Sequence, residues 1–186
     1  MNSEDLRYDK TSDWGHTWVG DLHLSNIGMN GRNLNIATED SNLHFAGGNG
    51  ELTESTEIFY HHSSNYGQTW FIDNQITSDD GYPSQWPFTA VNRNIVHIAW
   101  DDMKFGGTEI ITIRSTDNGV TWLEENRLSY SHVARDCRIA TGEAGTFAVW
   151  NDARHSDSLN SELYLRASFD GGETWEPEER ITFAIG

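Results

Sequence analysis

An eight-residue pattern recurs four times in this chain and constrains the fold more than any other feature of the sequence. Each copy reads Ser or Thr, any residue, Asp or Asn, any residue, Gly, any residue, Thr and Trp. The copies begin at residues 11, 63, 115 and 168, at intervals of 52, 52 and 53 residues. A repeat of nearly constant period predicts an architecture in which one structural unit is used several times. We call these segments the octapeptide turns; they are residues 11–18, 63–70, 115–122 and 168–175.

The residue types of the octapeptide turn suit a tight turn between two β-strands. The Asp or Asn side chain is expected to accept hydrogen bonds from backbone N–H groups of the turn, and the Gly to adopt a positive φ. The Trp offers a large apolar surface to a neighbouring unit. These roles are structural and involve no catalysis. The predicted structural residues are Asp13, Gly15, Trp18, Asn65, Gly67, Trp70, Asp117, Gly119, Trp122, Asp170, Gly172 and Trp175.

Short alternating segments flank every octapeptide turn. In the third unit, EIITIRS at 109–115 precedes the turn, and TWLEENRLS at 121–129 follows from it. Two more short segments lie upstream, FTAVN at 88–92 and IVHIAW at 95–100. Period-2 alternation with short connections indicates four antiparallel strands per unit. Four-stranded units of this length, marked by aromatic residues, are typical of β-propeller blades.

The predicted fold class is therefore all-β, with about 3.5 propeller blades in a single partial domain. We letter the strands of a blade A to D from the propeller axis outward, so that each octapeptide turn joins strands C and D. Three complete blades are predicted, and residues 4–26 supply only strands C and D of an earlier blade. The ranges of the complete blades are 30–78, 79–130 and 131–183.

Charge and composition exclude several classes of function. The formal net charge is -17, and nucleic-acid binding, which needs a basic surface, is not expected. Binding to anionic membranes is disfavoured for the same reason, and no segment approaches the roughly 20 apolar residues of a membrane span. The first ten residues lack the apolar core of a signal peptide, so the compartment stays undetermined.

Metal and cofactor sites are not predicted. The eight histidines form no metal-binding pattern, and the single cysteine, Cys137, leaves no intrachain disulfide and no cysteine-based metal site. The chain has no phosphate-binding glycine loop and no nucleophile elbow. We therefore expect no cofactor.

The four repeats resemble the Asp-box (BNR) blades of sialidases and their relatives. The resemblance covers almost the whole chain and implies a propeller fold, but it does not distinguish catalytic members from non-catalytic ones. The stretch CRIATGEAGTFAVWNDARHSDSLNSELYLRASFDGGETW at 137–175 is similar to the opening blade of a sialidase.

The resemblance also implies roles for particular residues of that stretch. Arg138 stands where the family places an arginine that binds the substrate carboxylate, and Asp152 and Arg154 occupy Asp-x-Arg positions. Asp157 falls in the loop that carries the acid/base aspartate. Cys137 and Ala140 depart from the family's aromatic-Arg-Ile-Pro motif, and the family's nucleophile and two further arginines have no counterpart here. The implied catalytic candidates are Asp157 and Asp152.

The face opposite the octapeptide turns is the expected ligand face, because propeller ligands bind where loops from several blades converge near the axis. Aromatic residues there either stack on a sugar or plug the core between blades. Carboxylates that follow them either act on a sugar or cap loop N–H groups. The candidate ligand-binding residues are Arg138, Arg154, Trp86, Trp100, Trp150, Asp101 and Asp102. Arg138 has two interpretations, a ligand-binding cation or a structural ion pair with Asp152 or Asp157.

Three and a half blades do not close a ring, and an open stack exposes apolar faces that favour association. We expect either a homo-oligomer, two copies completing a ring, or a fragment of a larger propeller. Three functions remain open: a glycan-recognising propeller that is not a complete catalyst as a single chain, an exo-sialidase-type glycoside hydrolase completed by a larger assembly, and a protein-interaction scaffold.

Overall fold

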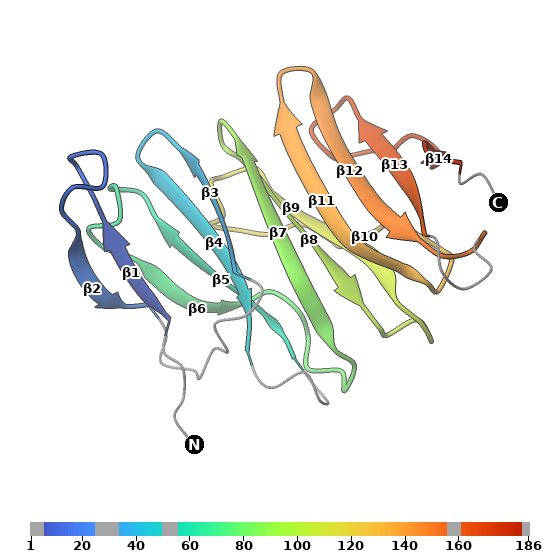
Figure 1. The fold of residues 1–186 in the computed structure, drawn as a ribbon, viewed down its shortest axis with the longest axis horizontal. Coiled ribbons are helices and arrows are strands. Elements are labelled where there is room, and N and C mark those ends of the chain that lie inside the picture. The colour runs from blue at the N-terminus through green and yellow to red at the C-terminus, as the bar shows by residue number, and fades with distance from the viewer. Residues whose placement is uncertain (1–5, 25–33, 50–55, 156–160, 184–186) are drawn as a thin grey trace.

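The computed structural model describes residues 6–24, 34–49, 56–155 and 161–183, and the elements in them are β-strands (Figure 1). The predicted all-β class is confirmed. No helix among these residues is long and apolar enough to cross a bilayer. The strands are β1 (Arg7–Lys10), β2 (Val19–His23), β3 (Asn35–Glu39), β4 (Asn42–Gly48), β5 (Ile58–Ser63), β6 (Phe71–Gln75), β7 (Ser84–Asn92), β8 (Ile95–Asp102), β9 (Glu109–Ser115), β10 (Asn126–Arg127), β11 (Ala134–Gly142), β12 (Gly145–Asp152), β13 (Glu162–Ser168) and β14 (Glu179–Arg180).

The strands form three four-stranded antiparallel sheets and one two-stranded hairpin. Each sheet pairs its strands in chain order, as a meander, and each lies inside one of the predicted blade ranges. We call them blade 1 (β3–β6), blade 2 (β7–β10), blade 3 (β11–β14) and the half-blade (β1–β2). Figure 1 shows them side by side in chain order, from the half-blade at one end to blade 3 at the other. The inner strand β7 lies between the inner strands β3 and β11.

The four octapeptide turns share two backbone hydrogen bonds, from the Thr N–H to the Asp or Asn Oδ1 and from the Gly N–H to the first Ser or Thr hydroxyl. In the third, Asp117 Oδ1 accepts the backbone N–H of Thr121 at 2.8 Å, and Asp117 Oδ2 accepts its hydroxyl at 2.6 Å. The Ser115 hydroxyl accepts the backbone N–H of Gly119 at 2.8 Å, and that glycine has a φ of +81°. The hydrogen bonds that Asp117 accepts lower its pKa to about 2. These bonds close the turn among its own eight residues, and the backbone N–H of Asn118 adds a bond to the carbonyl of Asn94 in the preceding connection.

The tryptophans of the second, third and fourth turns each pack against the preceding sheet. Trp70 lies edge-on to Tyr8 of the half-blade with ring centroids 5.0 Å apart, and Trp122 lies edge-on to Tyr60 of blade 1 at 4.9 Å. Trp175 approaches His97 of blade 2 at 6.4 Å. Edge-to-face pairs at these distances are favourable beyond their buried area. Successive sheets are therefore joined by one repeated aromatic contact.

The outermost strands are shorter than the sequence predicts. Residues 121–129 were expected to form one strand, but only Asn126–Arg127 pair regularly with β9. The backbone N–H of Leu123 still bonds the carbonyl of Arg114 and that of Leu128 bonds the carbonyl of Ile110. The residues between these two bonds do not pair regularly with β9. An outer strand has a neighbour on one side only, so it is held less firmly than an inner strand.

Candidate functional site

Blades 2 and 3 have the same irregularity in their inner strands, near the face opposite the octapeptide turns. The register of β7 with β8 shifts between Gln85 and Phe88, and that of β11 with β12 shifts between Arg135 and Arg138. Trp86 and Asp136 occupy equivalent places in these bulges, and each has a φ of 57°. Positive φ is strained for such residues, and bulges next to functional sites re-aim side chains.

The bulges gather exposed side chains of mixed chemistry. Trp86 is 41 % exposed. Arg135, Asp136 and Arg138 are exposed along the neighbouring inner strand, and the Arg138 guanidinium lies over the Phe88 ring, 5.1 Å from its centroid. We call this cluster the axial bulge site; its members are Trp86, Phe88, Asp101, Arg135, Asp136 and Arg138.

The Arg138 guanidinium is available to a ligand. Its Nη1 donates to the backbone carbonyl of Cys137 at 2.9 Å. Within the described ranges no carboxylate lies at ion-pair distance from Arg138 or from Arg135. The alternative in which Asp152 neutralises Arg138 is therefore not realised.

Asp101 is buried beneath the bulge of blade 3. Its side chain is 4 % exposed, and its Oδ2 accepts the backbone N–H of Asp136 at 3.1 Å. Its Oδ1 is buried without a hydrogen-bond partner. Burial, with a smaller contribution from the charge of Asp136, raises the pKa of Asp101 to about 7. This carboxyl group can hold or release a proton near neutral pH.

Three neighbouring candidates serve the fold instead. Trp100 and Trp150 are 0 % and 1 % exposed and lie in the cores between blades. A ring with no exposed face cannot stack on a sugar, which corrects the expectation of a sugar-facing indole at both positions. Asp102 accepts the indole N–H of Trp100 at 3.0 Å and the backbone N–H of Lys104 at 2.9 Å. It fits the capping alternative rather than ligand binding.

Asp152 and Arg154 form an ion pair that recurs in the preceding blade. Arg154 Nη2 lies 2.7 Å from Asp152 Oδ2, and the same guanidinium bonds Glu178. In blade 2 the ammonium of Lys104 lies 3.5 Å from Asp102 and 2.7 Å from Glu125. A pair repeated in two blades, with its cation engaged by two carboxylates, holds the loop to the outer strand.

This ion pair engages both groups that the resemblance assigns to the site, so that the ligand-binding role of Arg154 and the catalytic role of Asp152 stay predictions. Although burial raises the pKa of Asp152, the hydrogen bonds from Arg154 and Ser131 outweigh it and leave that pKa lowered. A carboxylate that stays ionised is a poor general acid. Asp157, the other implied catalytic residue, lies outside the described residues.

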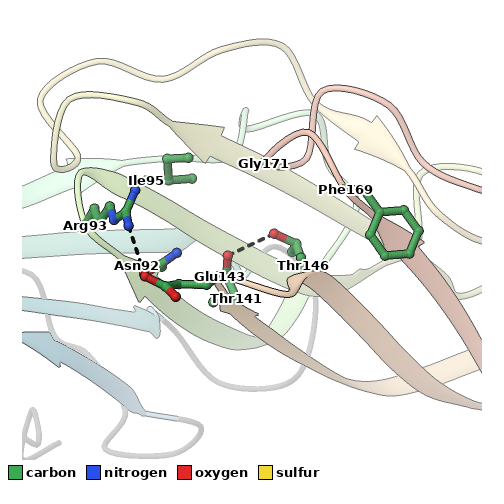
Figure 2. Close-up of a pocket in the computed structure, with 10 residues that line it drawn as sticks. Asn92, Arg93, Ile95, Thr141, Glu143, Thr146, Phe169 and Gly171 are labelled. Carbon is green, nitrogen blue, oxygen red and sulfur yellow. Dashed lines mark hydrogen bonds and ion pairs between the residues drawn. The ribbon is translucent and has the colours of Figure 1, made fainter.

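A pocket of about 400 Å³ opens on the other face of the molecule, beside the octapeptide turn of blade 3 (Figure 2). Four of its polar side chains are paired with each other. Arg93 bonds Glu143 at 3.0 Å, and the hydroxyls of Thr141 and Thr146 are 2.9 Å apart. Across residues 6–24, 34–49, 56–155 and 161–183, no group of three or more His, Cys, Asp or Glu side chains could hold a metal ion.

Arg135 and Asp136 are not among the residues that the sequence singled out as candidates. A signal was present, because Asp136 stands fourteen residues before Trp150, as Trp86 stands before Trp100. That spacing marks equivalent positions in the repeat. It shows neither the bulge nor the positive φ, because both depend on pairing with the next strand.

No family model matches this chain, and no curated protein matches it. Solved structures do. An α-L-arabinofuranosidase of family GH93 from Fusarium graminearum, in complex with arabinobiose, matches with a TM-score of 0.60 at 16 % identity. The match covers 93 % of this chain and 57 % of that one. The fold is a β-propeller fold.

Other propellers give the same result. An α-L-arabinanase of Penicillium chrysogenum with arabinobiose matches with a TM-score of 0.61 and 17 % identity, over 93 % of this chain and 57 % of its own. A Hadza microbial sialidase matches with a TM-score of 0.58 and 20 % identity, over 77 % and 36 %. The chain thus spans a little over half of the arabinan-active propellers and about a third of the sialidase.

Proposed function

We propose that this chain is a sialidase-like Asp-box propeller that recognises a glycan and is not a complete catalyst as a single chain. The glycan class is supported by the three structural neighbours named above, which are glycoside hydrolases, two of them solved with arabinobiose. The Asp-box assignment is supported by the four octapeptide turns and their shared hydrogen bonds.

One observation carries the proposal: Arg138 is an exposed guanidinium on an inner strand that pairs with no described carboxylate. In a chain of net charge -17, such a cation is a local site for an anionic group. A guanidinium binds a carboxylate through two parallel hydrogen bonds. Trp86 occupies the position of blade 2 that is equivalent to Asp136 in blade 3. Its exposed ring is suited to stacking on the face of a sugar. A sugar that carries a carboxylate is therefore the ligand we expect.

The test is calorimetric titration of the protein with sialyllactose and with lactose. We expect saturable binding of sialyllactose, weaker binding of lactose, and loss of the difference in Arg138→Ala. Arg93→Ala is the matched control, because Arg93 is an exposed arginine on the opposite face whose partner is Glu143. Binding that survives Arg138→Ala, or that Arg93→Ala abolishes equally, would contradict the proposal. Absence of any sugar binding would favour the protein-interaction scaffold.

Glycoside hydrolysis is a second candidate, favoured by Asp101. A pKa of about 7 lets this carboxyl group hold a proton near neutral pH, which is the protonation state that a general acid needs. The assay is release of a fluorophore from a sialoside. Turnover proportional to protein concentration and abolished by Asp101→Asn would support the hydrolase over the binding propeller, and no turnover would leave the binding function alone.

A further inference from the structure

The contact that joins neighbouring sheets has a donor side and a receiving side. The donor is the octapeptide turn, whose Trp enters the junction and whose Gly leaves room for it. A Cβ placed on Gly67, Gly119 or Gly172 would collide with Tyr8, Tyr60 or His97 of the preceding sheet. Each of these three turns is therefore covered by an aromatic ring of the sheet before it.

The turn of the half-blade has the donor residues, and none of the described sheets receives them. Trp18 is 63 % exposed, whereas Trp70, Trp122 and Trp175 are partly buried. A Cβ on Gly15 would meet no atom within 4 Å, although its φ of +89° matches that of the other turn glycines. This end of the molecule presents a complete, unused donor turn.

The outer face of blade 3 is the corresponding receiving side. The receiving positions of blades 1 and 2 are buried; they are His44, Tyr60, His97 and Thr112. Their equivalents in blade 3 are Phe147 and Leu165, which are apolar and only partly buried, as are Val149 and Leu163 beside them. Strand β12 alternates between buried and partly buried residues, whereas β8 is buried along seven of its eight residues. No sheet formed by the described residues covers this face.

We propose that a second copy of this chain binds here, with the Trp18 turn of one copy seated on Phe147 and Leu165 of the other. Both halves of the contact are present in the same chain, at opposite ends of the row of sheets (Figure 1). The contact repeats the one that Trp70, Trp122 and Trp175 make within the chain. This inference is independent of the proposed sugar site.

The two surfaces differ, so the contact is head to tail, and it is satisfied fully only in a closed ring. Two copies joined at both contacts contribute six four-stranded sheets and two hairpins from the described residues. Six four-stranded sheets lie within the range of four to eight blades that propellers typically have. Each copy would bury the Trp18 turn and the blade 3 face together.

The experiment measures the native mass by light scattering on a size-exclusion column over a series of protein concentrations. We expect a mass of twice 21.1 kDa for the unmodified chain. Trp18→Glu and Leu165→Glu place a charge in the donor and the receiver, and each variant is expected to run at 21.1 kDa. An equimolar mixture of the two is expected to recover the larger species, because one intact donor and one intact receiver remain.

Trp14→Glu is the matched control, since Trp14 belongs to the same turn and is fully exposed. Its equivalent in blade 1, Tyr66, stays 61 % exposed although that turn is packed on the half-blade. Trp14→Glu should keep the larger mass, and far-ultraviolet circular dichroism of all variants checks that they are folded.

A monomeric unmodified chain at every concentration would overturn the proposal and point to some other covering partner. A larger species that persists in Trp18→Glu or Leu165→Glu, or a mixture that stays monomeric, would equally overturn the head-to-tail contact.

Discussion

Replacing Asp101 by Asn should stabilise this protein, and the gain should grow with pH. The pKa of Asp101 is about 7, against 3.8 for an aspartate in water, because the carboxyl group is buried. Between these two values the folded state holds a proton that the unfolded state has lost. The contribution of Asp101 to the free energy of unfolding therefore falls as pH rises through this window.

The magnitude follows from the separation of the two pKa values. Three pH units at about 1.4 kcal/mol each put the cost of ionising Asp101 in the folded state at about 4 kcal/mol above pH 7. At pH 5 the folded carboxyl is still protonated and the cost is smaller by about 3 kcal/mol. An amide stays neutral at every pH and its oxygen can accept the backbone N–H of Asp136. The advantage of Asp101→Asn should thus increase by about 3 kcal/mol from pH 5 to pH 8.

The assay is urea unfolding followed by tryptophan fluorescence at pH 5 and pH 8, at one protein concentration. Burial lowers the pKa of His44 and His97 to about 4, so their protonation on unfolding makes stability rise with pH below 6.5. Both proteins share this effect, and it cancels in their difference.

Asp102→Asn is the matched control for this prediction. Asp102 is the next residue and is also buried, but its carboxylate accepts the Trp100 indole and lies beside Lys104. Its replacement should destabilise the protein at both pH values. An effect of Asp101→Asn that is the same at pH 5 and pH 8, or that becomes destabilising at pH 8, would refute the reasoning.

Two further predictions concern packing and charge. Gly15→Ala should lose about 1 kcal/mol of stability, which is the cost of a positive φ in a residue with a Cβ. Gly119→Ala should lose about 2 kcal/mol more, because its Cβ would also collide with Tyr60. Equal losses of the two variants in thermal unfolding would contradict the contact with Tyr60. Arg154→Ala should lose about 3 kcal/mol by leaving buried Asp152 unpaired. Arg154→Lys should lose much less, since a lysine fills the equivalent position of blade 2, and a similar loss for both variants in urea unfolding would contradict the ion pair.

The amino-acid sequence by itself determined the repeating architecture. The octapeptide turn is closed by hydrogen bonds among residues no more than four positions apart, such as Asp117 with Thr121 and Ser115 with Gly119. The strands beside it follow a period-2 pattern that is equally local. Four copies of such a unit predict four-stranded sheets in chain order, and the structure has them.

The tertiary structure alone decided which candidate residues remain available to a ligand. Trp86, Trp100 and Trp150 are all tryptophans of blades 2 and 3, yet only Trp86 is exposed. Exposure depends on whether the next sheet covers a residue, and that sheet comes from residues about fifty positions away.

The same distinction separates Arg138 from Arg154. The sequence resemblance implied a ligand-binding role for both, but Arg154 is engaged by Glu178, 24 residues along the chain, whereas Arg138 reaches over Phe88 of the neighbouring blade. Local hydrogen bonding fixes a turn wherever its eight residues occur. The charge and burial of a site are set by contacts between residues distant in sequence, and these exist only once the sheets have packed.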